Sequence, residues 1–409
     1  MKTIALIGTF DSKGEEYQYV QQLLESMGNN VFTINTGVFK SAFEPDVDVA
    51  VIAEMVGENI NDIRKKNDRA FATEILSRGV EKLLPTLFKE GEFDAVLSFG
   101  GTGGTSLVTP GMRQLPIGVP KVMVSTVASG DTSTYVGTSD ILMMPSIVDV
   151  SGLNKISKVI FQNAAAAVSG MVNAHFEKEK DHRPLVAASM FGVTTPAVDY
   201  ARKYLEREGY EVLVFHATGV GGKTMEKLIR EGYFSGVLDL TTTELADELV
   251  GGILSAGPNR VEAASEKGVP QIISLGALDM VNFGAYETVP QKFSARNFYR
   301  HNPTVTLMRT TESENEQLGK ILANKLSKAH GKTILMIPSA GVSLIDSPEN
   351  PFYGPEEDAL LFKTIKNQLN NSAVKVVERE NNINDQEFAE ESAKLLLQLM
   401  KEDNNEYTK

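Results

Sequence analysis

Short segments rich in β-branched residues alternate with longer helical segments along almost the whole chain, and no other feature restricts the fold as strongly. The strand-like "TIALIG" is followed by the helical "GEEYQYVQQLLESMG", then by "NVFTIN" and "VDVAVIAEM", and then by an amphipathic stretch over residues 67–89. This order is typical of parallel sheets that are covered by helices. We therefore predict an α/β protein with two Rossmann-like domains and mostly parallel sheets.

The same order of elements restarts near the middle of the chain. The 409 residues are too many for one ordinary core. The charged, proline-closed segment "EKEKDHRP" precedes a new strand-like run, "PLVAASMFG". We therefore predict an N-terminal Rossmann-like domain over residues 1–180 and a C-terminal Rossmann-like domain over residues 181–409, which ends in an amphipathic helix from about residue 380.

The two halves also resemble each other in detail. "KEGEFDAVLSFGGTGGTS" in the first half aligns with "REGYFSGVLDLTTTELAD" in the second. A duplication of one α/β unit would explain this likeness, and it would place corresponding loops at the carboxyl edge of each sheet. Only the first copy has a glycine-rich loop at that position.

Charge and composition exclude several classes of function. The formal net charge is −13 and no long block of lysine and arginine occurs, so neither nucleic acid nor an anionic membrane is an expected partner. No apolar run is long enough to span a membrane and the N-terminus lacks the pattern of a signal peptide, so we expect a cytoplasmic protein. The chain has no cysteine, and its five histidines lack metal-ligand spacing. Small molecules remain as the expected ligands.

The stretch "FGGTGGTS" at residues 99–106 follows the apolar run "DAVLS". The dinucleotide pattern fails because Ser106 stands where a glycine is needed, and no Walker A ending follows. What remains is either a plain tight turn or a nest of backbone N–H groups that suits phosphate oxygens. Four glycines are more than a turn needs, so we favour ligand binding. The predicted contacts are Gly100, Gly101, Thr102, Gly103, Gly104 and Thr105.

A second stretch, "GTFDSKG" at residues 8–14, ends the first predicted strand and begins the first predicted helix. Ligands of parallel sheets bind at the carboxyl ends of strands, where helix N-termini favour anions. Asp11 would face a metal ion and Lys13 a phosphate group. The alternative is a helix with a capping box at its start and both charges in solvent. The predicted contacts are Gly8, Thr9, Asp11, Ser12 and Lys13.

The stretch "ATGVGGKT" at residues 217–224 is a secondary candidate site. It is one glycine short of a Walker A loop, because Ala217 stands at the first position. In a divergent P-loop, Gly221, Gly222 and Lys223 would contact phosphate, and Asp239 at the end of a later strand would hold Mg²⁺. The same spacing fits a loop that only lines a cleft between the domains.

Long polar loops follow two other apolar strands. Three carboxylates in these loops are candidate metal or ribose contacts, although each could equally stabilise a turn. They are Asp131, Asp140 and Asp279. A basic cluster in the second half could receive an anion or pair with acidic surface residues. It comprises Arg296, His301 and Arg309.

Several motifs in a fixed order, among them "GTFDSKGEE", "FGGTGGTS", "ATGVGGKTME" and "DSPENPFYGPEED", make the chain resemble the Tm-one-like ATP-binding domain family. Its members are uncharacterised bacterial relatives of the tomato tobamovirus-resistance protein. The resemblance runs from Thr3 to about Leu369 and concerns only the N-terminal region of the plant protein. It implies a two-part α/β protein that binds ATP with Mg²⁺ and forms dimers. The plant protein's antiviral role is not implied, and no protein partner is identified.

The leading hypothesis is a cytoplasmic ATP-binding protein of unknown biochemical activity. Its MgATP phosphates would rest on residues 99–106, with Lys13 as charge partner and Asp11 or Asp140 near the Mg²⁺ ion. One alternative is an enzyme that acts on a small anionic metabolite in the interdomain cleft, held by residues 217–224 and the basic cluster. Another is a regulatory homodimer module that ATP controls.

Overall fold

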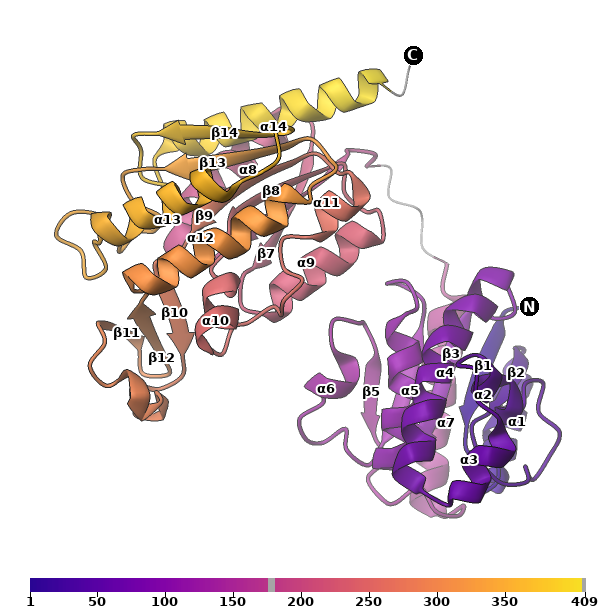
Figure 1. The fold of residues 1–409 in the computed structure, drawn as a ribbon. Helices are drawn as coiled ribbons and strands as arrows, with labels where there is room; N and C mark the ends of the chain where they lie inside the picture. Colours follow the sequence, from indigo (N-terminus) through magenta and orange to yellow (C-terminus); the bar gives the residue numbers. More distant parts are fainter. Residues whose placement is uncertain (176–180, 407–409) are drawn as a thin grey trace. The chain divides into compact units, whose positions relative to one another are not determined.

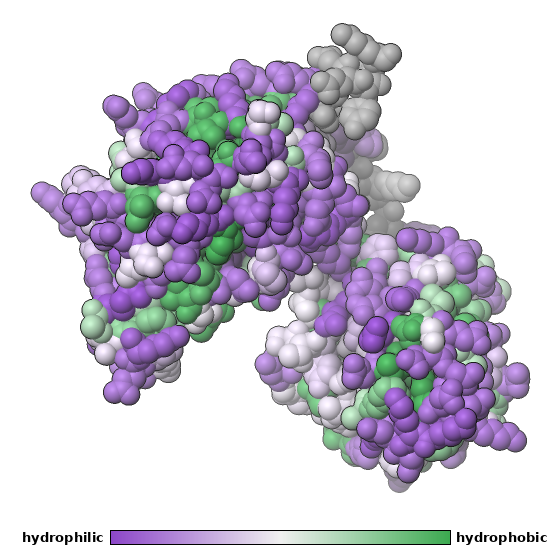
Figure 2. Space-filling view, viewed as in Figure 1, coloured by the Kyte–Doolittle hydropathy of each residue, from purple (hydrophilic) through white to green (hydrophobic). Residues whose placement is uncertain are grey.

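The computed structural model describes residues 1–175 and 181–406, which fold as two compact units (Figure 1). Unit 1 is Met1–Glu179 and unit 2 is Lys180–Lys409. The boundary expected after residue 180 adjoins residues 176–180, which lie outside the described residues. Each unit has its own sheet and its own core, and hydrophilic residues cover most of the surface that Figure 2 shows.

Unit 1 is built on a five-stranded sheet in the order β2-β1-β3-β4-β5, in which neighbouring strands are parallel. Its strands are β1 (Thr3–Gly8), β2 (Asn30–Asn35), β3 (Ala95–Gly100), β4 (Lys121–Ser125) and β5 (Leu142–Pro145). Every residue of the central strand β3 is buried, as expected where helices cover both faces of a sheet. The predicted α/β fold with mostly parallel sheets is confirmed.

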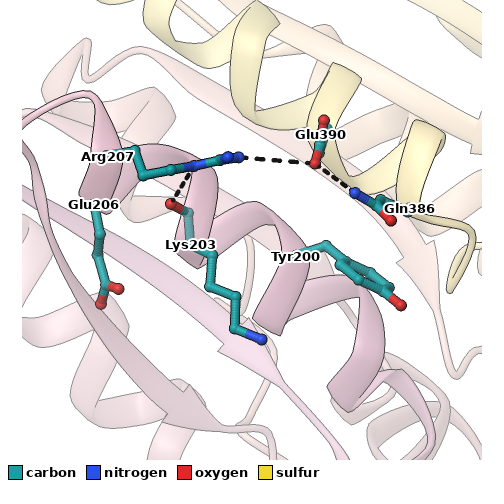
Figure 3. A pocket seen from close by; sticks show the side chains of 6 residues that line it. All are labelled: Tyr200, Lys203, Glu206, Arg207, Gln386 and Glu390. Atoms are coloured by element: carbon teal, nitrogen blue, oxygen red, sulfur yellow. Dashed lines mark hydrogen bonds and ion pairs between the residues drawn. The ribbon is translucent and has the colours of Figure 1, made fainter.

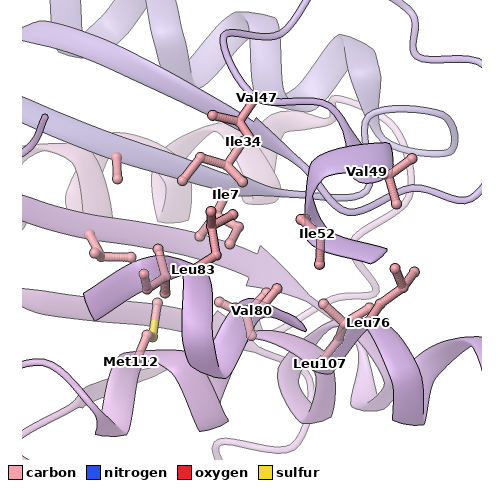
Figure 4. Close-up of a cluster of buried hydrophobic side chains, with 14 of the residues drawn as sticks. Ile7, Ile34, Val47, Val49, Ile52, Leu76, Val80, Leu83, Leu107 and Met112 are labelled. Atoms are coloured by element: carbon pink, nitrogen blue, oxygen red, sulfur yellow. The ribbon is translucent and has the colours of Figure 1, made fainter. Parts of the chain in front are cut away.

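Helices cover both faces of this sheet, and a separate apolar core fills each side. On one face, Ile52 of α2, Leu76 of α4 and Leu107 of α5 pack against the strands (Figure 4). On the other face, Tyr17 of α1 and Phe161 of α7 pack in the second core. The helices are α1 (Gly14–Ser26), α2 (Val49–Glu54), α3 (Ile60–Lys66), α4 (Arg69–Glu90), α5 (Thr102–Arg113), α6 (Ser133–Val136) and α7 (Lys155–Asn173).

The first helix does not begin with the capping box that the sequence suggests as an alternative. Lys13 occupies the N-cap position of α1, and no side chain caps the helix. Ser12 instead donates its hydroxyl to Thr9 Oγ1 at 3.1 Å. Glu16, in the first turn, accepts a hydrogen bond from the N–H of Gly152 at 2.6 Å. Tertiary contacts therefore hold the start of α1.

Unit 2 is built on a six-stranded parallel sheet in the order β14-β13-β9-β8-β6-β7. Its strands are β6 (Leu185–Met190), β7 (Glu211–His216), β8 (Gly236–Thr241), β9 (Gln271–Gly276), β13 (Thr333–Pro338) and β14 (Val374–Arg379). A separate antiparallel sheet, β10-β12-β11, consists of β10 (Met280–Phe283), β11 (Phe298–Asn302) and β12 (Val305–Arg309). Residues 280–283 directly follow Asp279 in one of the long polar loops that the sequence predicts, but pairing with β12 makes them a strand.

The helices of unit 2 also cover both faces of their sheet. The helices α8 and α14 pack on one face, and α12 and α13 contribute to the core on the other. The α-helices are α8 (Thr195–Arg207), α9 (Val220–Arg230), α10 (Glu244–Val250), α11 (Ala263–Lys267), α12 (Glu312–Ser327), α13 (Pro355–Gln368) and α14 (Gln386–Glu406). Short 3₁₀ helices cover Gly192–Thr194, Tyr286–Thr288 and Gln291–Phe293.

The last helix, α14, is the amphipathic helix that the sequence predicts. It begins at Gln386 rather than near residue 380, and it buries Phe388, Leu396 and Met400 against α8 and the sheet. In the part of the chain that the structure describes, no helix is both long enough and apolar enough to cross a membrane.

The two parallel sheets share one strand plan. In each, the first strand lies between the second and the third: β2-β1-β3 in unit 1 and β7-β6-β8 in unit 2. A duplicated α/β unit would leave this pattern. Where the strand order reverses, a crevice opens at the carboxyl ends of the strands, and ligands of such sheets bind there. The expected ligand sites are therefore the carboxyl ends of β1 and β3 in unit 1 and those of β6 and β8 in unit 2.

Candidate functional site

The carboxyl ends of β1 and β3 border a cavity of about 670 Å³ in unit 1. The β1–α1 loop contributes Thr9, Asp11, Ser12 and Lys13 to its lining, and the β3–α5 loop contributes residues 100–104. The two stretches that the sequence places at one sheet edge therefore meet on a single cavity. This cavity lies at the point where the strand order of the sheet reverses.

The N-terminus of α5 forms one wall of the cavity. The helix begins at Thr102 after the N-cap residue Gly101, and the N–H of Thr105 bonds to the Gly101 carbonyl at 3.0 Å. The first N–H groups of a helix have no partner within it, so those at the start of α5 are available to a ligand. A Cβ on Gly104 would meet open space, whereas one on Gly103 would come within 3.2 Å of Arg69 Nη2.

Two of the predicted contacts lie outside the lining. Thr105 is fully buried, and its hydroxyl bonds to the Gly101 carbonyl at 2.9 Å and to Ser125 Oγ at 2.6 Å. Gly8 lies under Tyr17, because a Cβ there would be 1.7 Å from the phenol oxygen. Burial raises the pKa of Tyr17, whose hydroxyl bonds to the backbone of β1 and β3. Both residues support the loops from below.

Three cationic side chains line the cavity. Lys13 donates a hydrogen bond to the carbonyl of Val150, and Arg64 donates from Nε to the carbonyl of Val38 at 2.5 Å. Arg69 is exposed at the cavity, and within residues 1–175 and 181–406 its guanidinium bonds to no carboxylate. Arg69 therefore brings a positive charge to the start of α5, while the lining as a whole holds three cationic and three acidic side chains.

Sequence reasoning misses the two arginines because they do not follow a strand. The helices α3 and α4 bring Arg64 and Arg69 to the cavity from the side. The sequence does carry a local signal for Arg69, because Asp68 before it is a typical N-cap residue. In the structure, Asp68 accepts hydrogen bonds from the N–H groups of Ala70 and Phe71 and so fixes the start of α4. A helix start that places an arginine in its first turn was thus visible in the sequence, but its position beside the glycine loop was not.

Besides Asp68, which caps α4, two carboxylates line the cavity. Asp11 Oδ2 accepts a hydrogen bond from the N–H of Phe39 at 2.9 Å. Asp149 is exposed and lies in the segment after β5. It is not among the acidic residues that the sequence suggests as ligands. Among the residues that the structure describes, no three acidic or histidine side chains are grouped as a metal site. A divalent cation in this cavity would thus need further ligands from a bound molecule or from water.

Asp140 lies at the opposite edge of the sheet and does not join this cavity. It precedes β5, and its carboxylate pairs with Lys121 Nζ at 2.6 Å and accepts the N–H of Gly118 at 2.8 Å. Burial would raise the pKa of Asp140, but these hydrogen bonds and the Lys121 charge lower it. The segment from residue 126 to residue 141 runs from the carboxyl end of β4 to the amino end of β5, which carries Asp140 away.

The other two candidate acids serve the fold. Asp131 is exposed and accepts a hydrogen bond from the N–H of Ser133 at 2.9 Å, at the start of α6. Asp279 in unit 2 is fully buried and accepts a hydrogen bond from Ser343 Oγ at 2.8 Å. Burial and the nearby Asp346 raise the pKa of Asp279 to about 7. The first carboxylate stabilises a turn, and the second ties two loops together.

The stretch at residues 217–224 forms the start of α9, and a carboxylate of the protein already occupies its anion position. Glu244 Oε1 accepts hydrogen bonds from the N–H groups of Gly219 and Gly222, at 2.7 and 3.1 Å. A Cβ on Gly222 would lie 2.1 Å from Glu244 Oε2, and one on Gly221 would lie 1.8 Å from the carbonyl oxygen of His216. These glycines permit close packing, and Lys223 points to an exposed surface. The contacts do not fit a P-loop.

Glu244 belongs to a buried ion cluster around Arg260, at the strand-order reversal of unit 2. Arg260 Nε donates to Glu244 at 2.6 Å, and its two terminal nitrogens bond to Asp239 at 2.5 and 2.7 Å. Glu226 and the carbonyl of Thr241 accept the remaining hydrogen bonds. Asp239 therefore pairs with a buried guanidinium instead of standing ready for Mg²⁺.

The basic cluster of unit 2 is likewise engaged within the protein. Arg296 pairs with Glu314 through two hydrogen bonds, at 2.9 and 2.6 Å. Arg309 is buried and bonds to Asp358 at 2.8 Å. His301 is exposed on β11. The cluster and residues 217–224 all lie in unit 2, where Arg296, Arg309 and the N–H groups of Gly219 and Gly222 already have protein partners.

Unit 2 has a hollow of about 570 Å³ on its surface, between α8 and α14 (Figure 3). Within it, Arg207 lies 3.8 Å from Glu390, which also accepts a hydrogen bond from Gln386 at 2.8 Å. The lining residues are Tyr200, Lys203, Glu206, Arg207, Gln386 and Glu390.

Comparisons with known proteins match both halves of the chain to one family. The N-terminal domain model of an uncharacterised protein family, UPF0261, matches residues 2–177, and the C-terminal domain model of that family matches residues 183–400. A "UPF0261 protein" of Clostridium tetani is 51% identical over 400 residues, which cover 98% of this chain and 99% of that protein.

The likeness extends to a plant protein over almost the whole chain. The "ToMV resistance protein Tm-1" of Solanum lycopersicum is 41% identical over 411 residues, which cover 94% of this chain and 54% of the tomato protein. Among solved structures, a UDP co-structure of MnaA from S. aureus is 12% identical with a TM-score of 0.23, covering 67% of this chain and 79% of that one. A TM-score this low supports no argument about fold or function.

Proposed function

The chain belongs to the uncharacterised protein family UPF0261, and we propose that it binds ATP with Mg²⁺ in the cavity of unit 1, with the phosphates at the N-terminus of α5. The observation that carries this proposal is a convergence at one cavity of about 670 Å³. Two loops from the carboxyl ends of β1 and β3 and the starts of α1, α4 and α5 all border it. This volume lies within the range of small-molecule sites.

The charges of the cavity suit a polyphosphate. The start of α5 directs the positive end of the helix dipole and its first N–H groups to the cavity, whereas Asp68 already accepts two of the first N–H groups of α4. Arg69 adds a full positive charge beside Gly103 and has no carboxylate partner among the described residues, and Lys13 adds a second positive charge to the lining of the cavity. Backbone N–H groups and a planar guanidinium are the donors that phosphate oxygens commonly use.

The shape of the glycine loop fits the same ligand. Space for phosphate oxygens exists beside Gly103 and Gly104 because neither has a side chain, and a Cβ on Gly103 would press against Arg69. Asp11 and Asp149 offer the carboxylate oxygens that Mg²⁺ prefers, and phosphate oxygens would supply other ligands. Mg²⁺ in this role would neutralise part of the phosphate charge.

Calorimetric titration of the full chain with MgATP tests the proposal. We expect saturable binding to the wild type and at least about a tenfold loss of affinity in Gly103→Val, because the new side chain would fill the phosphate space and displace Arg69. Gly170→Val is the matched control, since Gly170 lies in α7 with no atom within 4 Å of the added Cβ. Absence of binding at millimolar MgATP, or an unchanged affinity in Gly103→Val, would overturn the proposal.

A further inference from the structure

One aromatic side chain of unit 1 lines the cavity instead of packing in a core. Phe39 is 65% exposed, although it belongs to a loop whose other phenylalanine is well packed. That residue, Phe43, stacks on Phe10 with ring centroids 4.6 Å apart. Phe39 also borders a neighbouring cavity of about 490 Å³, so its ring is accessible from that side as well. An exposed ring of this size is a common means of binding a flat ligand.

The backbone that carries Phe39 is fixed from two sides. Asp11 Oδ2 accepts the N–H of Phe39 at 2.9 Å, and Arg64 Nε donates to the carbonyl of Val38 at 2.5 Å. A Cβ on Gly37 would lie 2.5 Å from Asp11 Oδ1, so a glycine is needed there for the carboxylate to reach the loop. The ring is therefore presented at the cavity by an anchored segment.

The lining of the cavity divides into two chemically different parts. The start of α5 with Lys13 and Arg69 is polar and positive, whereas apolar side chains of α3, α4 and α5 form another part of the wall. These apolar residues are Ile63, Ala72, Leu76 and Leu107. Inorganic phosphate or a sugar phosphate would leave the apolar wall and the Phe39 ring without a partner. A ligand that joins a phosphate chain to a flat heterocycle would use both parts.

We propose that Phe39 is the stacking platform for the base of the nucleotide and so determines that this cavity takes nucleotides in preference to simple phosphates. The inference rests on the proposed function, because it assumes that the phosphates lie at the start of α5. Stacking of a base on an aromatic side chain typically accounts for about a 5- to 100-fold gain in affinity. Removal of the ring should therefore weaken nucleotide binding without weakening phosphate binding.

Calorimetry of the full chain with two probes, ATP and inorganic tripolyphosphate, each with Mg²⁺, separates these effects. In Phe39→Ala we expect the ATP affinity to fall about 5- to 100-fold and the tripolyphosphate affinity to stay within about twofold of the wild type. Phe39→Trp should retain ATP binding, because the larger ring still stacks. Tyr353→Ala is the control, since Tyr353 is an exposed aromatic residue in a loop of unit 2.

Each contrary outcome identifies what has failed. If the wild type binds ATP and Phe39→Ala binds it equally well, the base does not stack on this ring and the inference is wrong, while the proposed function stands. If Phe39→Ala loses both probes to the same extent, the ring supports the loop and does not select the base, which also overturns the inference. If the wild type binds neither probe, the proposed function falls and this inference falls with it.

Discussion

The two glycine-rich helix starts of this chain have similar sequences and opposite environments. In unit 1, the start of α5 opens onto a cavity lined by Lys13 and Arg69. In unit 2, the start of α9 is closed by the carboxylate of Glu244, which Arg260 holds in place at 2.6 Å. Both starts therefore favour an anion, but only the first leaves room for a ligand to supply it. Whether such a motif is a binding site depends on one carboxylate from a different helix.

We expect the largest effect when the carboxylate that closes the start of α9 is removed, and this effect is a loss of stability in unit 2. Glu244→Ala would leave Arg260 short of a partner and the N–H groups of α9 without an acceptor, at a cost of about 3–5 kcal/mol in the free energy of unfolding. Urea unfolding followed by circular dichroism measures this loss. Glu248→Ala, an exposed acid in the same helix, is the control and should change stability little. A loss below about 1 kcal/mol in Glu244→Ala would contradict the structural role of the cluster.

A smaller effect should distinguish the glycines of the two helix starts. Gly222→Ala would place a Cβ 2.1 Å from Glu244 Oε2, and we expect this crowding to cost about 2–3 kcal/mol. Gly104→Ala meets open space, so its free energy of unfolding should stay close to that of the wild type. Thermal unfolding of the two variants side by side gives the comparison. Equal losses would show that the starts of α5 and α9 are packed alike.

The pH dependence of stability should also differ between the units. In unit 2, burial raises the pKa of Asp247 to about 7. The contribution of Asp247 to the stability of unit 2 is therefore fully present below the pKa that Asp247 has in the unfolded chain, and it is lost as the pH rises through 7. In unit 1, burial would also raise the pKa of Asp140, but hydrogen bonds from Lys121 and Gly118 lower it below its usual value. The contribution of Asp140 to the stability of unit 1 is therefore lost as the pH falls through this lowered pKa.

We therefore expect the titration of Asp247 to cost unit 2 about 2–3 kcal/mol of stability between pH 5 and about pH 7.5, and Asp247→Asn to remove this part of the change, while Asp279, whose pKa is also raised to about 7, still titrates. Urea unfolding at a series of pH values measures it. If the stability of unit 2 rose with pH over this interval, the buried carboxyl would not be the group that titrates.

The fold and one half of the candidate site could be predicted because both follow from local sequence. Alternating strand and helix patterns define a parallel sheet, and loops that follow two adjacent strands must meet at its carboxyl edge. The stretches at residues 8–14 and 99–106 therefore reach one cavity. The misplacement of Asp140 has a local cause, because the sequence does not show where a long loop crosses from one edge of a sheet to the other.

The rest of the site depends on contacts between distant segments. Arg69 reaches the glycine loop because α4 packs beside α5, and Glu244 closes the start of α9 from another helix. Neither contact has a periodicity or a spacing that a single sequence reveals. The antiparallel sheet β10-β12-β11 is similar: the pairing of Met280–Phe283 with β12 defines it, and the small polar residues around β10 suggest a loop.

The affinity for MgATP of the paired variants Lys13→Ala and Lys223→Ala, measured by calorimetry on the full chain, tests the central comparison most directly. Lys13 lines the cavity of unit 1, and Lys223 lies in the closed helix start of unit 2. We predict that Lys13→Ala weakens binding about tenfold, because it removes a charge beside the phosphates, and that Lys223→Ala binds as the wild type does. Loss of binding in Lys223→Ala with unchanged affinity in Lys13→Ala would place the ligand in unit 2 and contradict the account.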